Sequence, residues 1–194
     1  GIKADYVLVL EGRQRMGKSL LIRTLAEPWF ADFRVDPKNK DTVQQMRGKW
    51  IVEFAEMHAA KKADIDELKA FITRQHDEVR LPYRANPDYL PRQCIFIGTI
   101  NSREDVGYFR DDENARYFCV SCKHIYLDEL RADIDQLWAE TVHLWKTKRP
   151  PLWLTSKEHQ EAQREENTRR KLKDEWEDVI QAYLDKEGVD RIFI

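Results

Sequence analysis

Residues 12–19, GRQRMGKS, have the types and spacing of a phosphate-binding loop, because they match G-x-x-x-x-G-K-S/T at every specified position. In such a loop the backbone N–H groups surround phosphates, the lysine reaches the β/γ-phosphates and the hydroxyl binds Mg²⁺. We therefore expect Lys18 to neutralise phosphate charge and Ser19 to bind the metal. The alternative is an ordinary glycine turn with a surface lysine. The expected nucleotide contacts are Gly12, Arg13, Gln14, Arg15, Met16, Gly17, Lys18, Ser19 and Leu20.

Two glutamates follow an apolar run in residues 50–56, WIVEFAE. A nucleoside triphosphatase needs an acidic residue at the end of a neighbouring strand, where it holds the metal and positions water. We assign Glu53 to the metal and Glu56 to polarising water, although the sequence also allows the opposite assignment. It also allows one of the two to be merely a solvated carboxylate at a strand end.

A third apolar run, residues 94–101 with the sequence CIFIGTIN, ends in Asn101. A carboxamide at that place is able to hydrogen-bond the attacking water or the γ-phosphate. The simpler interpretation of a lone asparagine at a strand end is a turn former. Together with the two preceding motifs, the pattern favours a role in catalysis.

These residues must be positioned by a parallel sheet, because the apolar runs are short, rich in β-branched and aromatic residues, and separated by helical stretches. Strands are predicted at residues 6–10, 50–55, 94–100 and 116–120, and a helix at residues 19–25. A second helix is predicted at residues 64–75, followed by a polar, proline-bearing loop at residues 80–92. The expected class is α/β with a mostly parallel central sheet.

After Ser121 the apolar spacing becomes helical, with a stripe from Leu127 to Trp145, and Pro150 and Pro151 interrupt the chain. A long charged helix is predicted from Thr155. Its early part, residues 157–171, has almost no apolar face and is expected to project into solvent or to bridge to a partner. Its later part is amphipathic and stops at Gly188. We expect two regions, residues 1–125 and a helical extension at residues 126–194, in a fragment cut before a further domain.

Composition excludes several classes. The chain has 194 residues, 42% of them hydrophobic, and a net charge of −2, which is typical of globular proteins. No apolar run approaches the roughly 20 residues of a membrane span, so a cytoplasmic location is expected. Three cysteines do not form a disulfide framework. Cys119 and Cys122 form a CxxC near His124, but without a second CxxC we favour core packing over zinc.

The segments GRQRMGKS, RGKWIVEFAE, ITRQHDEVRLPYR, PRQCIFIGTINSRE and NARYFCV, in this order, resemble the virulence-associated E family. These are P-loop ATPases of phages, prophages and mobile islands, similar to superfamily 3 helicases and primase-helicases. The resemblance implies an AAA+-like P-loop NTPase core with ATP and Mg²⁺, a homo-oligomeric ring that is usually a hexamer, and action on DNA in replication of a mobile element.

Carried over by residue, the resemblance makes Lys18 and Ser19 the Walker A pair, Glu53 and Glu56 the Walker B acids, and Asn101 the sensor. Arg116 matches the arginine that such rings insert into a neighbour's ATP site. Residues 114–118 read NARYF, where the family more often shows Gly-Asn-Arg-Arg-Phe-Trp, so one of two arginines is missing. A plain arginine at the start of a strand is the alternative for Arg116.

A group of arginines interleaved with tyrosines lies between the second and third apolar runs. Arginines with aromatic residues suit phosphate neutralisation and base stacking, and superfamily 3 helicases carry a DNA-gripping hairpin in this segment. The alternative is a solvated loop whose arginines pair with nearby acids or contact an adjacent subunit. The candidate DNA contacts are Arg74, Arg80, Arg84 and Arg92.

The leading functional hypothesis is therefore an ATP-hydrolysing motor of the superfamily 3 helicase type on single-stranded or forked DNA. The alternative is a nucleotide-dependent assembly module or regulatory switch without strand separation. A small-molecule kinase is weaker, because nothing in the sequence clearly supplies an acceptor site.

Overall fold

The computed structural model describes residues 4–33, 35–55, 62–79, 86–101, 107–109, 116–172 and 175–187. Its centre is a five-stranded sheet in the order β2-β3-β6-β1-β7, in which every pairing is parallel. The strands are β1 (Val7–Gly12), β2 (Phe30–Ala31), β3 (Ile51–Ala55), β6 (Ile95–Asn101) and β7 (Tyr117–Ser121). The predicted α/β class and mostly parallel sheet are confirmed.

The register brings the carboxyl ends of the strands to one edge of the sheet. Gly12 of β1 lies opposite Asn101 of β6, and Glu11 lies opposite Ser121 of β7. On the other side of β6, β3 pairs so that Glu53 faces Ile97. Ligands of open α/β sheets bind outside this edge, so the sheet places the predicted site residues where such a site belongs.

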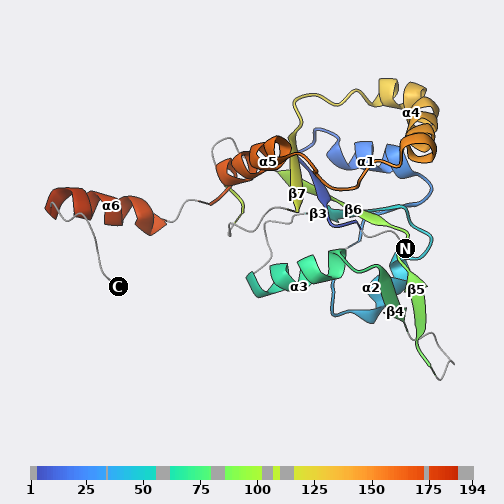
Figure 1. Cartoon of the computed structure of the whole chain (residues 1–194), viewed down its shortest axis with the longest axis horizontal. Helices are drawn as coiled ribbons and strands as arrows, with labels where there is room; N and C mark the ends of the chain where they lie inside the picture. The colour runs from blue at the N-terminus through green and yellow to red at the C-terminus, as the bar shows by residue number, and fades with distance from the viewer. Residues whose placement is uncertain are drawn as a thin grey trace.

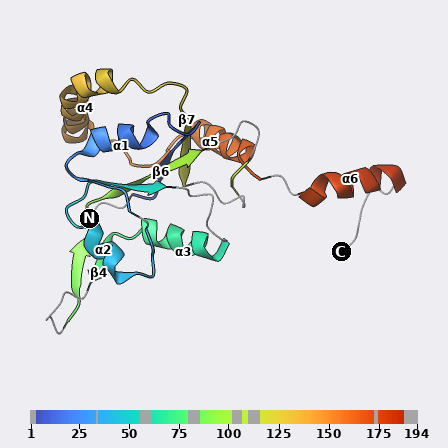
Figure 2. The ribbon, with the colours of Figure 1, turned by 180° about the vertical axis from the view of Figure 1, so that it is seen from behind.

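Helices cover both faces of the sheet, which explains why its strands are apolar almost throughout. Helices α1 (Lys18–Ala26) and α4 (Leu127–Lys148) lie on one face, and α2 (Lys40–Met46) and α3 (Lys62–Ile72) on the other (Figures 1 and 2). Leu10 and Ile22 belong to the core under α1, whereas Val9 and Phe71 belong to the core on the α3 side. Alternation along β1 therefore sends successive side chains to different cores.

A two-stranded antiparallel hairpin corrects the prediction for residues 80–92. Strand β4 (His76–Val79) pairs with β5 (Asp88–Pro91), so part of the predicted loop is a strand. The helix before it ends at Ile72 rather than at residue 75, because β4 begins four residues later. Both strands are polar and short, which hides them from a search for apolar runs.

The predicted long charged helix is in fact two helices, α5 (Lys157–Arg169) and α6 (Glu175–Glu187). Helix α5 does not project into solvent. Gln163 and Asn167 donate side-chain hydrogen bonds of 3.0 and 3.1 Å to the carbonyl of Tyr117 in β7. Polar contacts thus attach a helix with little apolar surface, whereas α6 lies away from the sheet (Figure 1). None of the helices in the described ranges is long and apolar enough to span a bilayer.

Candidate phosphate-binding site

The backbone of the loop between β1 and α1 requires glycine at both glycine positions of the motif. Gly12 and Gly17 have φ values of 154° and 89°, which side-chain-bearing residues rarely adopt. A Cβ at Gly12 would lie 2.8 Å from the carbonyl oxygen of Cys122. The loop leads directly into the N-terminus of α1, where free N–H groups and the helix dipole favour an anion.

Lys18 lies inside this loop. Its side chain is buried, and Nζ donates hydrogen bonds to Gly12 O at 2.9 Å, Arg13 O at 2.8 Å and Asn101 Oδ1 at 3.1 Å. Burial lowers the pKa of Lys18, while Cys122 and Glu53 act in the opposite direction. The interpretation as a surface lysine after a simple glycine turn is therefore wrong.

Ser19 and Glu53 meet beside the lysine. The hydroxyl of Ser19 donates to Glu53 Oε1 at 2.6 Å, and the hydroxyl of Thr99 donates to the same oxygen at 2.8 Å. Glu53 is itself buried. A hydroxyl and a carboxylate are the hard oxygen ligands that Mg²⁺ accepts, and Mg²⁺ typically takes only one or two protein ligands besides substrate phosphates. The donor set fits that ion.

The structure thus brings four of the predicted residues together: Lys18, Ser19, Glu53 and Asn101. The remaining loop side chains Arg13, Gln14 and Arg15 are exposed, Leu20 is half exposed, and Met16 packs near Gly12. Glu56 lies outside the described residues. The assignment of a water-polarising role to it stays a prediction.

Arg116 lies at the other edge of the sheet. Its carbonyl accepts a hydrogen bond from the N–H of Val7, at the start of β1, and its guanidinium donates to Lys69 O of α3 at 3.4 Å. Strand β7 separates this point from the carboxyl edge by about 13 Å at roughly 3.3 Å per residue. In this arrangement Arg116 does not reach Lys18 of its own chain, which leaves a role toward another subunit or a structural role.

The four arginines predicted to contact DNA have different surroundings. Arg74 is exposed and lies 5.1 Å from the centre of the Phe71 ring, whereas Arg80 and Arg84 lie outside the described residues. The prediction that Arg92 contacts DNA is wrong. Arg92 is buried, forms a close bidentate ion pair with Asp77, and donates to Phe71 O at 2.5 Å. Its guanidinium fastens the hairpin to α3 and is not available to a DNA backbone.

Among the described residues, no group of three or more His, Cys, Asp or Glu side chains is placed to hold a metal ion. Cys119 lies in β7, and burial raises its pKa to about 11. Cys122 follows the strand, and its backbone closes against Glu11 and Gly12. Cys119 packs against the core on the α3 side of the sheet, and Cys122 packs beside the loop.

Sequence reasoning missed two features of this edge. Thr99 lies two residues before Asn101 and therefore on the same face of β6, so strand alternation could have identified it. Glu11, directly before the loop, binds Arg170 across 159 residues of sequence. No local pattern connects two positions so far apart.

The fold and the site define an α/β protein with a G-x-x-x-x-G-K-S loop at the carboxyl edge of a parallel sheet. The chain belongs to the virulence-associated protein E-like domain family, whose family model matches residues 1–171. No curated protein sequence matches the chain significantly.

Many solved structures resemble it, and two of them are of the same protein region. The apo A form of the NrS-1 C-terminal region has a TM-score of 0.50 and 18% identity, over 96% of this chain and 47% of that chain. A second structure of that region has a TM-score of 0.48 and 15% identity, over 95% and 46%. The chain spans about half the length of these structures, and at this identity the first likeness concerns the fold alone.

Proposed function

We propose that this chain binds and hydrolyses ATP as a P-loop NTPase of the AAA+ and superfamily 3 helicase-like type. The observation that carries the proposal is the placement of Lys18, whose ammonium group is held by two loop carbonyls and by Asn101 at the N-terminus of α1. Ser19 and Glu53 form an oxygen pair one residue further along. These are the groups that phosphoryl transfer requires, since its catalysis is mostly positioning and charge stabilisation.

Each described residue has a role that its position supports, and the role of Glu56 rests on the sequence alone. The loop N–H groups and the α1 terminus surround the phosphates, and Lys18 neutralises their charge. Ser19 and Glu53 hold Mg²⁺, which when bound supplies further neutralisation of the phosphate oxygens. Asn101 orients a water or the γ-phosphate through its carboxamide, and Glu56 polarises the attacking water.

We further propose that the ATPase works on DNA as a homo-oligomeric ring, as a motor in replication of a phage or mobile element. Family membership supports the setting. Arg116 is compatible with the ring, because it lies at the sheet edge opposite Lys18 and so has no part in the site of its own chain. Residues 1–125 form the ATPase core in this proposal and residues 126–194 its helical extension; Arg74, Arg80 and Arg84 remain the proposed DNA contacts.

The first test is ATP hydrolysis by Lys18→Ala, with Lys49→Ala as control because Lys49 is a partly exposed lysine outside the site. We expect Lys18→Ala to lose roughly 100-fold or more of the turnover and to bind nucleotide more weakly, since the backbone amides cannot replace the cation. The control should hydrolyse ATP as the wild type does. Wild-type turnover in Lys18→Ala would overturn the assignment of this loop.

Single-stranded DNA separates the motor from the alternative of a nucleotide-dependent assembly switch. Turnover and molar mass by light scattering should be measured with and without single-stranded DNA. Stimulation of ATP hydrolysis by DNA supports the motor. Turnover that stays constant with DNA of every length, together with nucleotide-dependent assembly, supports the switch.

A further inference from the structure

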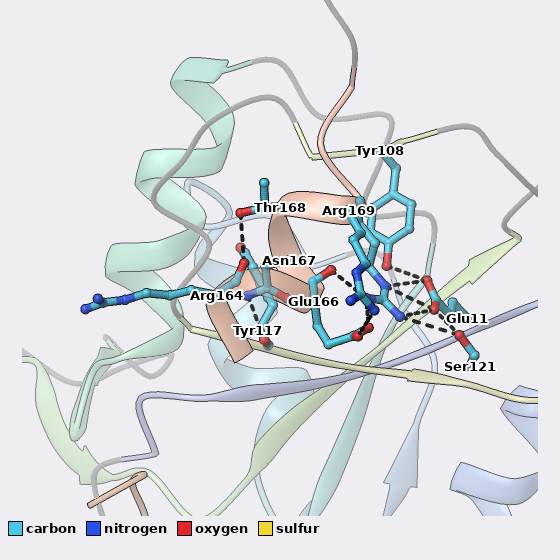
Figure 3. A network of polar contacts seen from close by, with 10 residues as sticks. Glu11, Tyr108, Tyr117, Ser121, Arg164, Glu166, Asn167, Thr168 and Arg169 are labelled. Carbon is cyan, nitrogen blue, oxygen red and sulfur yellow. Dashed lines mark hydrogen bonds and ion pairs between the residues drawn. The ribbon is translucent and has the colours of Figure 1, made fainter. Parts of the chain in front are cut away.

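A second polar cluster lies at the same edge of the sheet and has no part in the proposed chemistry. It consists of Glu11, Tyr108, Ser121, Glu166 and Arg170, here named the Glu11 cluster (Figure 3). Arg170 donates to Glu11 through Nε at 2.9 and 3.0 Å and through Nη2 at 2.5 Å. Tyr108 donates to Glu11 Oε2 at 2.7 Å, and Ser121 donates to Oε1.

The cluster lies on the face of the sheet opposite Lys18, yet it is joined to the phosphate-binding loop through the main chain. Glu11 shares its face with Val7 and Val9, whereas Leu10 points toward α1. Glu11 directly precedes Gly12, whose carbonyl accepts the Lys18 hydrogen bond. The contacts of the Glu11 side chain on this face therefore hold the main chain next to Gly12, where the loop starts.

The carboxylate is charged and fully engaged. Burial acts to raise the pKa of Glu11, but the hydrogen bonds from Arg170, Ser121 and Tyr108 outweigh it and hold that pKa below its usual value. Burial and the neighbouring Cys119 raise the pKa of Tyr108, which keeps its hydroxyl a donor. A buried carboxylate with this many donors has a restricted position.

Arg170 also connects this anchor to the chain that follows Asn101. Its carbonyl accepts hydrogen bonds from Tyr108 N at 2.8 Å and Phe109 N at 2.9 Å, and Leu172 N donates to Phe109 O at 2.7 Å. Residues 108 and 109 come a few positions after Asn101 in the chain. The end of α5 is thus tied both to Glu11, which directly precedes the loop, and to residues 108 and 109.

We propose that Arg170 is a positioning residue for the phosphate-binding loop: through the Glu11 carboxylate it fixes the end of β1, so that Gly12 holds Lys18 where phosphates bind. The proposal rests on the proposed nucleotide site. The loop has little freedom to absorb a shift of Glu11, because Gly12 lies against the Cys122 carbonyl. Coupling is reciprocal, so bound nucleotide must in turn stabilise the contact of α5 with the loop.

The test compares Arg170→Met with Arg164→Met. Arg164 lies on the same helix, is exposed and points away from Glu11 in Figure 3, so its substitution removes the same charge without touching the cluster. The measurement is the affinity for fluorescent ADP. We expect Arg170→Met to bind roughly 10- to 100-fold more weakly, the size of effect that a small misplacement produces. Arg164→Met should bind as the wild type does, and Arg170→Lys should recover part of the loss.

The double variant Glu11→Gln with Arg170→Met tests whether weak ADP binding by Arg170→Met results only from misfolding. It removes the unpaired buried charge and keeps an amide that Tyr108 and Ser121 are able to contact, so it should fold well but still bind ADP weakly. Wild-type affinity in the folded double variant, or in Arg170→Met itself, would overturn the positioning role.

Hydrogen exchange provides a readout without nucleotide. Arg170→Met should speed amide exchange in residues 12–18 relative to both wild type and Arg164→Met, and unchanged exchange there also overturns the role. If the wild type itself binds no nucleotide while the exchange difference is present, it is the proposed function that fails and not the link between Arg170 and the loop.

Discussion

The ammonium group of Lys18 has three N–H donors, and the structure gives each of them an oxygen acceptor. A buried cation without such partners would cost several kcal/mol or would lose its proton. Because all three donors are engaged, phosphate oxygens must replace at least one of these acceptors when nucleotide binds. The loop therefore holds its lysine in place before the substrate arrives.

Glu53→Gln removes the negative charge at the proposed metal position but nearly preserves the shape of the side chain. The amide oxygen of glutamine is able to accept from Ser19 and Thr99 as the carboxylate does, so the fold should persist. The Mg²⁺ concentration for half-maximal ATP hydrolysis should rise at least about tenfold, because a neutral ligand holds the ion weakly. The measurement is a Mg²⁺ titration of turnover, with Glu78→Gln on the exposed side of β4 as control. An unchanged titration would place the metal at Glu56 instead.

At the residue scale the sequence was sufficient wherever chemistry requires a residue type at a fixed spacing. Lys18 and Ser19 were predicted for that reason, Glu53 and Asn101 because they lie at the ends of apolar strands, and the four meet. Arg92 was not predictable from its neighbours in sequence, because its burial depends on Asp77, which lies across the hairpin from it. An arginine among tyrosines has the same local pattern whether it contacts nucleic acid or closes a hairpin.

At the scale of the elements, β7 separates two chemical regions. Its carboxyl end meets the phosphate-binding loop, and its amino end carries Arg116. A parallel sheet with aligned ends therefore presents Lys18 at one edge and Arg116 at the other. Subunits that stack edge to edge would bring the arginine of one copy to the loop of the next.

Arg116→Ala tests this arrangement. The variant should bind ATP like the wild type but hydrolyse it about 10³-fold more slowly, since an arginine supplied in trans is worth that much in related phosphoryl transfer. Mixing it with Lys18→Ala should restore some activity, because one partner supplies an intact loop and the other an intact arginine. The rescue should fade on dilution, as association requires.

Arg131→Ala is the matched control, an exposed arginine on α4 whose loss should leave turnover unchanged. A mixture without rescue, under conditions where light scattering shows rings, would mean that Arg116 has a structural role through its contact with α3.

The sequence reveals the elements that have a continuous or periodic apolar pattern, and it does not reveal the others. The four apolar strands were predicted within one or two residues, because burial on both faces demands continuous apolar side chains. Strands β4 and β5 are polar, and β2 has two residues, so none of them gives a periodic signal. The end of α5 depends on Arg170 and on residues 108–109, which are contacts that no helical pattern contains.

At the scale of the whole molecule, the sheet carries separate polar clusters on its two faces, one that is the proposed phosphate site and one that anchors α5. The first is built around Lys18 and the second around Glu11. They share only the main chain of Glu11 and Gly12. Stability and nucleotide binding therefore depend on neighbouring residues with different side-chain partners.

Global stability should depend on pH through Glu11. Its pKa in the folded state lies below 4.5, the ordinary value, so its contribution is fully present above that pH and is lost as the pH falls through the folded-state pKa. Urea unfolding measured stepwise from pH 7 to pH 3 should show the difference between wild type and Glu11→Gln shrinking below about pH 4.5. The control is Glu129→Gln, an exposed substitution on α4, whose free energy of unfolding should change with pH as that of the wild type does. If Glu11→Gln also followed the wild type at every pH, the ion pair would contribute nothing to stability.

The strand order also determines when the protein is able to fold. Strand β1 is made well before its neighbours in the sheet, which are residues 95–101 and 117–121. At roughly 5 to 20 residues per second, a ribosome needs about 5 to 20 s more to supply them. During that time the apolar side chains of Val7, Val9 and Leu10 have no sheet to join. Such distant pairing slows folding, so β1 is synthesised early relative to its neighbours in the sheet but is completed only after them.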